Sequence, residues 1–388
     1  MLASPAITLA TGNGGLSRLA EALYGALEEV PRFDRCAFLD YPDHLNAGDH
    51  FIFVASVTYL TLARRARVAY TASLADFCPG EMERRAGGAP IFLQGGGNLG
   101  DLWPESQLFR ERIISSYKDR PIVVLPQTVH FQRQENLRRA SGIFNSHPDL
   151  TLFVRDRESL EIAARHFQGC RVHLAPDMMA ALTDLPALCL KPAPRKEILY
   201  LTRADGEANQ SLMPAELGIE GLEVRDWPTY DWAYAGRGKL REYSQWYWRL
   251  PGAVDAYREI WQRGVRQPGG YVSRLVWRHL APWRSAAAGL DRPDLWFRSW
   301  DILHDCLRQL SSYGLIITSR LHGHLAASVA GIPNVLLASS YHKNRAFFET
   351  WCSGQQLARF AASPAQVRSA VDELARFRVD KRSSSRCL

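Results

Sequence analysis

Arg320 and His322 stand two residues apart, directly after an apolar run that ends at Thr318. A histidine has an unperturbed pKa near neutrality, so it can give and take a proton at physiological pH. An arginine beside it can bind a small anion through its planar guanidinium group. The pair therefore predicts a site that holds an anion and moves a proton. A lone histidine is more often structural, and we assign a helix-packing or supporting role to His324.

A second polar segment follows the next apolar run along the chain. The stretch from Ile316 to Trp351 has the pattern strand, polar turn, helix, strand, polar turn, helix. Its turns contain Ser319, Arg320, His322 and His324, and then Tyr341, His342, Lys343, Asn344 and Arg345. Open α/β sheets bind ligands where adjacent parallel strands end. We therefore expect Lys343 and Asn344 to join Arg320 and His322 in one anion site.

The first half of the chain alternates short β-like runs with amphipathic helical stretches, which is typical of a doubly wound α/β sheet. The predicted strands are residues 35–40, 67–70, 90–94, 121–125, 150–155 and 171–174. The predicted helices are residues 49–63, 104–117, 134–145 and 157–167. Small and polar residues follow most of these strands, so we expect them to collect at one edge of the sheet.

Gly95, Gly96, Gly97 and Asn98 follow one of the predicted strands. Glycines let the backbone approach a ligand closely, and N–H groups at the next helix can hold an anion. The run does not match G-x-G-x-x-G, and no acidic residue is placed about twenty residues further on, which argues against a dinucleotide site. Asp49, expected at the same edge, is either the cap of a helix or a functional carboxylate.

Two arginines occupy matching positions at strand ends. Arg155 ends an apolar strand, and the adjacent Asp156 is able to fix its side chain. Arg203 ends the predicted strand 197–203 in the second half of the chain. Both are candidate anion ligands, whereas Arg157 is interpreted as an ordinary surface residue.

The length of 388 residues exceeds one comfortable hydrophobic core, so two domains are expected. We predict a Rossmann-like domain over residues 1–185 and a Pro-rich linker over residues 186–195. A second Rossmann-like domain is predicted over residues 196–360, followed by a C-terminal helix with a flexible tail over residues 361–388.

Residues 227–300 form an insertion in the second domain that is rich in tryptophan and arginine. Nine of the eleven tryptophans of the chain fall within it. Such a composition suits a membrane interface or a sugar-stacking surface. The alternative is an extra helical layer with tryptophans in its core, and we favour this alternative for most of the individual tryptophans.

The composition is that of an ordinary soluble globular protein, with 46% hydrophobic and 22% charged residues. No apolar run approaches the roughly 18 residues of a membrane span, and the first residues lack the basic region of a secretion signal. The seven cysteines include no C-x-x-C pair, which indicates reduced thiols rather than disulfides or a zinc site. The net charge of +7 comes with no recognisable nucleic-acid-binding module. Only six of the 47 basic residues are lysines, an excess of arginine that fits codon bias or an anionic substrate.

The motifs, taken in order, resemble the polysaccharide pyruvyl transferase family. In the N-terminal part the resemblance rests on Gly-Gly-Gly-Asn (95–98), Leu-Pro-Gln-Thr (125–128), Val-Arg-Asp-Arg-Glu-Ser (154–159) and Ala-Pro-Asp-Met (175–178). In the C-terminal part it rests on Thr-Ser-Arg-Leu-His-Gly-His (318–324), Gly-Ile-Pro (331–333), Ser-Tyr-His-Lys-Asn-Arg (340–345) and Phe-Phe-Glu-Thr-Trp (347–351). It extends over roughly residues 40–355, apart from the insertion. Each motif is short, and the combination is specific.

The resemblance implies two Rossmann-like domains that face each other across a cleft, similar to GT-B glycosyltransferases, with the N-terminal domain on the acceptor side. It implies phosphoenolpyruvate as co-substrate, with no other cofactor and no metal. Matched by motif, the anion-binding and acid/base positions fall on Arg155, Arg320, His322 and Lys343, with Arg203 as a further match. The family pattern has a glycine where this chain has His342, on which the conformation of Lys343 depends.

We therefore predict an enzyme that transfers pyruvate from phosphoenolpyruvate to two hydroxyls of a sugar, as a cyclic ketal. The acceptor is a bacterial exopolysaccharide or its lipid-linked precursor. His322 is the expected proton donor, and the donor-binding residues are Arg155, Arg203, Arg320, Lys343 and Asn344. Gly95, Gly96, Gly97, Asn98 and Asp49 are expected to line the cleft, and Trp227 and Trp232 are candidate contacts to the acceptor.

Two alternatives stay open. One is a nucleotide-sugar glycosyltransferase of the GT-B class, against which the lack of any acidic residue between Ile316 and Phe348 counts. The other is an inactive glycan-binding protein. We expect a cytoplasmic protein, with peripheral contact at the inner face of the plasma membrane as a further expectation, and no nucleic-acid partner.

Overall fold

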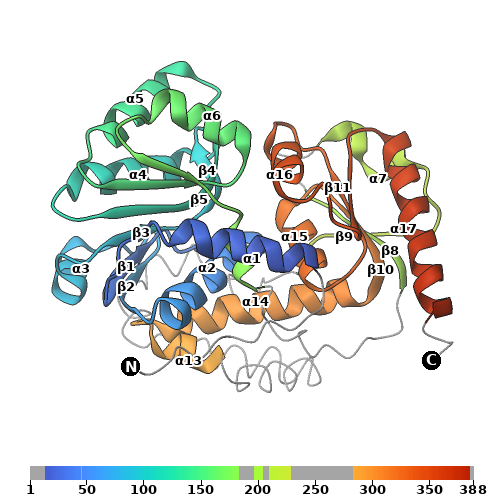
Figure 1. Ribbon diagram of the computed structural model, residues 1–388, viewed down its shortest axis with the longest axis horizontal. Helices are drawn as coiled ribbons and strands as arrows, with labels where there is room; N and C mark the ends of the chain where they lie inside the picture. The colour runs from blue at the N-terminus through green and yellow to red at the C-terminus, as the bar shows by residue number, and fades with distance from the viewer. Residues whose placement is uncertain (1–13, 45, 183–195, 204–208, 229–282, 385–388) are drawn as a thin grey trace. The chain divides into compact units, whose positions relative to one another are not determined.

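The chain forms two parallel β-sheets, with helices in most of the connections between their strands (Figure 1). The computed structural model describes residues 14–44, 46–182, 196–203, 209–228 and 283–384. The described residues divide into two compact units. One unit holds those of 29–178 and 226–306, and the other holds those of 1–28, 179–225 and 307–388. The expectation of parallel α/β sheets is confirmed, and the likeness to the GT-B arrangement stays a prediction.

The first unit contains a seven-stranded sheet of order β2-β1-β3-β5-β6-β7, in which β4 also pairs with β5. Its strands are β1 (Arg35–Leu39), β2 (Arg67–Ala72), β3 (Ile91–Leu93), β4 (Gly96–Gly100), β5 (Ile122–His130), β6 (Leu150–Val154) and β7 (Arg171–Leu174). All the pairs are parallel. Because β2 and β3 lie on opposite sides of β1, the chain changes direction there. The carboxyl ends of β1 and β3 are therefore a topological switch point.

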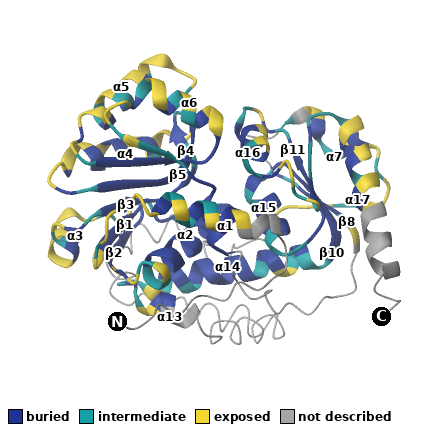
Figure 2. Ribbon diagram, in the orientation of Figure 1, coloured by how far each residue is buried: buried dark blue, intermediate teal, exposed yellow. Residues whose placement is uncertain are grey.

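The helices of this unit begin at recognisable signals. They are α2 (Ala47–Thr58), α3 (Pro79–Ala86), α4 (Pro104–Ser116), α5 (Gln134–Asn145) and α6 (Arg157–His166). Proline occupies the first turn of α3 and α4, where its missing N–H costs nothing. Asn46 and Asp156 cap α2 and α6 with their side chains. Figure 2 shows most of the strands buried and the outer faces of α3, α5 and α6 exposed, as expected for helices that cover a sheet.

A late segment of the chain completes the edge of this sheet. It comprises α13 (Trp283–Ala288) and the start of α14 (Pro293–Ser311). The N–H of Val68 donates to the carbonyl of Gly289 at 2.8 Å, and the N–H of Asp291 donates to the carbonyl of Val68 at 2.9 Å. Residues 289–291 therefore extend the sheet beyond β2.

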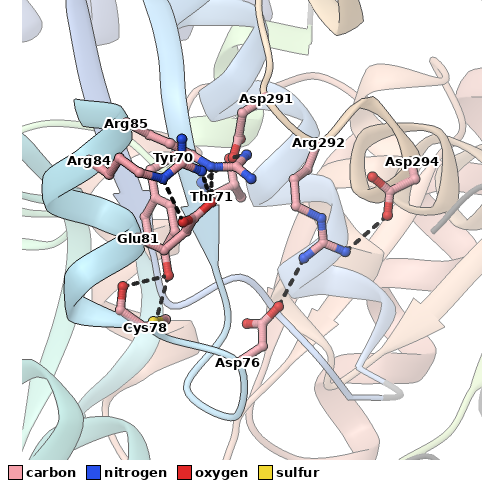
Figure 3. Close-up of polar contacts among 10 residues, drawn as sticks. All are labelled: Tyr70, Thr71, Asp76, Cys78, Glu81, Arg84, Arg85, Asp291, Arg292 and Asp294. Atoms are coloured by element: carbon pink, nitrogen blue, oxygen red, sulfur yellow. Dashed lines mark hydrogen bonds and ion pairs between the residues drawn. The ribbon is translucent and has the colours of Figure 1, made fainter. Parts of the chain in front are cut away.

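Side chains fix the same segment in place (Figure 3). Arg292 donates to Asp76 at 2.9 Å and to Asp294 at 3.0 Å, and Asp291 accepts from the N–H of Thr71 at 3.2 Å. Burial raises the pKa of Asp291 to about 6, against the opposing effect of Thr71, Arg292 and Arg85. This carboxyl group is therefore a pH-sensitive element of the contact.

The second unit contains a five-stranded sheet of order β12-β11-β10-β8-β9. Its strands are β8 (Lys196–Leu201), β9 (Leu222–Arg225), β10 (Tyr313–Thr318), β11 (Asn334–Leu337) and β12 (Ala358–Ala361). All the pairs are parallel, and β9 and β10 lie on opposite sides of β8. The carboxyl ends of β8 and β10 are therefore the switch point of this sheet. Its α-helices are α1 (Gly14–Leu27), α7 (Pro214–Leu217), α15 (Leu321–Val329), α16 (Lys343–Trp351) and α17 (Pro364–Ser384).

Most of the elements predicted from sequence are present, including the pattern strand, helix, strand, helix between Ile316 and Trp351. The predicted C-terminal helix is present as α17, which continues to Ser384. The two units interleave along the chain, unlike the linear division expected. The helix α1 belongs to the unit of the five-stranded sheet, and residues 283–306 belong to the unit of the seven-stranded sheet. The expected linker at 186–195 lies outside the described residues.

The insertion is described only at its ends. Trp296 and Trp300 are buried and stack with ring centroids 4.9 Å apart, so for these two the core interpretation is confirmed. The predicted membrane contact concerns mainly residues outside the described part. Across the described residues, none of the helices combines the length and apolarity that crossing a membrane requires.

Candidate functional site

The turn after β10 is tied to the end of β8. The Oγ1 of Thr318 donates to the carbonyl of Leu201 at 3.1 Å and accepts from the N–H of Arg320 at 3.0 Å. A Cβ at position 323 would lie 2.8 Å from Leu201 and 3.0 Å from Thr318. Gly323 therefore lets the first turn of α15 approach both strands closely. This packing places Arg320 and His322 at the carboxyl edge of the sheet.

Arg320 and Arg203 both lie at the switch point of the five-stranded sheet. The Nε of Arg320 donates to the carbonyl of Thr202 at 2.8 Å, and Arg203 is the next residue along the chain. Arg203 is buried, whereas Arg320 is half-buried at the N-terminus of α15. Two arginines and a helix N-terminus together favour an anion.

The turn after β11 is joined to the first turn by Asn344. Its Nδ2 donates to the carbonyl of Ser319 at 2.7 Å and to that of Leu337 at 2.8 Å. Lys343, also buried, begins α16, and its Nζ lies 5.4 Å from the centre of the Tyr341 ring. The predicted neighbourhood of the two turns is thereby confirmed.

The backbone conformation at His342 does not require a glycine. The residue has φ −58° and ψ −21°, which are ordinary right-handed helical angles. The departure from the family pattern therefore leaves Lys343 at the start of a regular helix.

The two histidines of the first turn have different surroundings. His324 is fully buried, with Nδ1 2.5 Å from Asn334 Oδ1 and Nε2 3.5 Å from Cys352 Sγ. Burial lowers the pKa of His324 to about 4, so the ring is neutral at physiological pH. Its predicted packing role is confirmed. His322 is half-buried in the first turn of α15, beside Arg320 in sequence.

Arg155 lies at the edge of the seven-stranded sheet in a buried ion pair. Its Nη1 lies 2.5 Å from Asp177 Oδ2, and its Nε donates to Thr128 Oγ1 at 2.9 Å. The expected partner Asp156 instead caps α6 and accepts from Thr128 at 3.1 Å. The charge of Arg155 is therefore balanced by Asp177, and its role as a donor ligand stays a prediction.

The glycine run forms strand β4 and its approach, rather than a turn that leads into a helix. A Cβ at Gly95 would lie 2.7 Å from the carbonyl oxygen of Pro126, and Gly96 has φ +133°. Close packing against β5 thus accounts for Gly95, and the positive φ accounts for Gly96. A part for Gly95, Gly96 and Gly97 in ligand binding stays a prediction.

Asp49 lies beside Gly96 of this run, and Asn98 follows its three glycines. The cap of α2 is Asn46, whose Oδ1 accepts from Gly48, so the capping interpretation of Asp49 is wrong. A Cβ at Gly96 would lie 3.5 Å from Asp49 Oδ1. The Oδ1 of Asn98 accepts from Arg110 at 2.8 Å.

Arg110 lies near the predicted cleft residue Asn98, although it was not itself predicted as a site residue. Arg110 is buried and lies within a helix, 70 positions after its partner Asp40. Neither the composition nor the spacing around it signals that contact.

The two candidate acceptor residues are only partly described. Trp227 is buried and packs edge-on against Phe51, with ring centroids 5.7 Å apart. This packing accounts for the ring, and a contact with an acceptor stays a prediction. Trp232 lies outside the described residues.

Comparisons with known proteins agree with the motifs. EpsO of Bacillus subtilis, which carries the name of a candidate pyruvyl transferase, is 29% identical over 337 residues, covering 87% of this chain and 91% of EpsO. Pyruvyl transferase 1 of Schizosaccharomyces pombe is 25% identical over 327 residues, covering 82% of this chain and 70% of the yeast protein.

A crystal structure of a functionally uncharacterised protein from Klebsiella pneumoniae has a similar fold. Its TM-score is 0.51 at 16% identity, over 91% of this chain and 100% of that one. A sequence model of the family described as polysaccharide pyruvyl transferase matches residues 18–341, which include Arg203, Arg320 and His322. The chain therefore belongs to the polysaccharide pyruvyl transferase family.

Proposed function

We propose that the protein transfers the pyruvyl group of phosphoenolpyruvate to two hydroxyls of a sugar, forming a cyclic ketal and releasing phosphate. The acceptor is a surface polysaccharide or its lipid-linked precursor. The observation that carries the proposal is the arrangement at the carboxyl edge of the five-stranded sheet. There Arg203, Arg320 and His322 follow β8 and β10, and Asn344 joins the turn of Lys343 to them.

Phosphoenolpyruvate carries a carboxylate and a phosphate, so it needs several cationic partners. Arg203, Arg320 and Lys343 are the expected ones, and Arg155 is a further expected ligand. Arginine suits either group because its planar fork can donate two parallel hydrogen bonds. The N-termini of α15 and α16 add backbone N–H groups at the same edge.

In the proposed reaction, protonated His322 donates its proton to the methylene carbon of phosphoenolpyruvate. This step makes a methyl group and leaves an oxocarbenium-like centre at C2. One sugar hydroxyl attacks C2 and loses its proton. The bond between C2 and the phosphate oxygen then breaks, inorganic phosphate leaves, and the second hydroxyl adds to C2 with loss of its proton. The cations around the phosphate stabilise the charge that develops as it leaves.

The donor substrate that the protein turns over distinguishes this function from the two alternatives. Purified protein would be incubated with phosphoenolpyruvate or with nucleotide sugars, each together with candidate glycans. The proposal predicts acceptor-dependent release of inorganic phosphate from phosphoenolpyruvate. Release of nucleotide from a nucleotide sugar would instead support a glycosyltransferase, and glycan binding without turnover of either donor would support an inactive glycan-binding protein.

A further inference from the structure

A second polar cluster occupies the switch point of the seven-stranded sheet. We call it the switch-point cluster, and its members are Asp40, His44, Asp49, Gln94, Asn98, Arg110 and Gln127. Asp40 directly follows β1, and Gln94 directly follows β3. A switch point is where open α/β sheets form a ligand-binding crevice.

Asp40 has a backbone conformation that is rarely adopted by residues other than glycine. Its φ is +68°, in the left-handed region. Its carboxylate is 10% exposed and lies 3.4 Å from both Arg110 Nη2 and Asn98 Nδ2, which are long contacts for a buried acid. Strained residues of this kind concentrate at functional sites. Burial raises the pKa of Asp40 to about 6, against the effect of Arg110, His44 and Asn98, and Asp49 raises it further.

Asp49 supplies a second carboxylate, which is more accessible. Its Oδ2 accepts from Asn46 Nδ2 at 2.9 Å and lies 3.5 Å from His44 Nε2. The Nδ1 of His44 accepts from the N–H of Asn46 at 3.3 Å, so the neutral ring carries its hydrogen on Nε2, toward Asp49. Asp49 is 22% exposed and His44 is 52% exposed. A ligand in solvent can therefore reach this side of the cluster.

Gln94 contributes an acceptor atom for which the described part of the chain supplies no hydrogen-bond donor. Its Nε2 donates to the carbonyl of Asp49 at 3.0 Å, which orients the amide beside the first turn of α2. The side chain is buried, and among the described residues nothing donates a hydrogen bond to its Oε1. A buried acceptor without a partner costs free energy, which a bound hydroxyl donor would recover.

Arg110 and Gln127 hold the inner side of the cluster rigid. Both donate to Asn98 Oδ1, at 2.8 Å and 3.0 Å. Gln127 also donates to the carbonyl of Gln94 at 2.8 Å. The groups that could contact a ligand are therefore supported by two buried side chains that are hydrogen-bonded to Asn98, as a preorganised site requires.

The chemistry of the cluster selects a neutral, hydroxyl-rich ligand. Two carboxylates repel an anion, and the buried guanidinium of Arg110 beside Asp40 opposes a metal cation. Sugar hydroxyls donate to carboxylate and amide oxygens and accept from an imidazole N–H. We propose that the switch-point cluster binds hydroxyl groups of the acceptor saccharide, with Asp49 and Gln94 Oε1 as hydrogen-bond acceptors and His44 as a donor. The identity of this sugar as an acceptor rests on the proposed function.

The test uses methyl glycosides of glucose, galactose and mannose as probes and detects them by saturation-transfer NMR on the full-length protein. Asp49→Asn is compared with Glu105→Gln, which removes an exposed acid from the first turn of α4, outside the cluster. We expect the wild type and Glu105→Gln to bind at least one glycoside equally. Asp49→Asn should weaken binding about tenfold or more, the effect of losing a hydrogen bond to a charged group. Gln94→Leu is a second variant with the same expected direction.

Binding of phosphoenolpyruvate, followed by calorimetry, is expected to be unchanged in all of these variants. A folded Asp49→Asn protein that binds the glycosides as the wild type does would overturn the proposal. So would a wild type that binds none of the probes, or one that binds only Mg²⁺ at the cluster. Glycoside binding without turnover of phosphoenolpyruvate would contradict the proposed function and leave this inference standing.

Discussion

The side-chain amide of Asn344 donates to the backbone carbonyl of Ser319 at 2.7 Å, across 25 positions of sequence. The same Nδ2 donates to the carbonyl of Leu337. One buried amide group thus joins the ends of β10 and β11 and sets the start of α16 against the turn that carries Arg320. The relation makes Asn344 a positioning residue for both halves of the proposed anion site.

We expect Asn344→Ala to lower the free energy of unfolding by about 1–3 kcal/mol, because two buried carbonyl groups lose their donor. The KM for phosphoenolpyruvate should rise, because Lys343 and Arg320 are then no longer fixed relative to each other. Urea unfolding and steady-state kinetics measure the two effects. Asn344→Asp, which keeps the shape but removes the donor, should be at least as damaging. A fully active Asn344→Asp protein would contradict the positioning role.

Arg155 and Asp177 form a buried ion pair, so removing either partner leaves an unpaired charge. We predict that Arg155→Ala costs about 3–5 kcal/mol of folding free energy. A double-mutant cycle with Asp177→Ala should show strong coupling in urea unfolding. If Arg155 acted only as a donor ligand, Arg155→Ala would instead raise the KM for phosphoenolpyruvate and leave stability intact.

The raised pKa of Asp291 leads us to predict that the free energy of unfolding depends on pH. Its pKa is raised to about 6 in the folded protein, so the stability it contributes is complete below its unfolded value near 3.8 and is lost as the pH rises toward 6. In that window this group should lower the free energy of unfolding by up to about 1.4 kcal/mol per pH unit. Asp291→Asn should remove that slope, and the variant should gain stability relative to the wild type between pH 4 and pH 6. Parallel unfolding curves for the two proteins across this range would contradict the assignment.

His322 and His324 give a matched pair of substitutions two residues apart. His322→Ala should reduce turnover by about 10²–10⁴-fold, the usual contribution of a general acid, with little change in thermal stability. His324→Ala should instead destabilise the fold, because Asn334 loses its buried partner. Ketal formation and thermal unfolding are measured for both proteins. Near-normal turnover of a folded His322→Ala protein would remove His322 from the acid role.

The local pattern of apolar and turn residues was sufficient to predict much of the fold. The strands that became β1, β5, β6 and β10 are apolar runs with turn residues after them, and burial on both faces keeps such runs recognisable. Strand β4 was missed because its glycine-rich sequence has low strand propensity, and pairing with β5 alone makes it a strand.

Side-chain contacts between residues far apart in the chain could not be predicted from the sequence. Arg155 has an acidic neighbour at position 156, yet its ion pair is with Asp177, on the connection after the next strand. In the same way, Asp40 contacts Arg110, and no local periodicity relates two positions so far apart. By contrast, the grouping of Arg320, His322 and Lys343 followed from a simple rule, because carboxyl ends of parallel strands share one edge.

In the proposed reaction the methylene carbon of phosphoenolpyruvate becomes the methyl group of the ketal. The most direct measurement is the reaction in D₂O with a saccharide acceptor, followed by NMR and mass spectrometry of the product. Proton transfer from exchanged His322 predicts a pyruvate ketal whose methyl group carries one deuterium, together with inorganic phosphate, and predicts far less of this product from His322→Ala. A product that keeps the methylene group as an enol ether, or a ketal methyl without deuterium, would contradict the account.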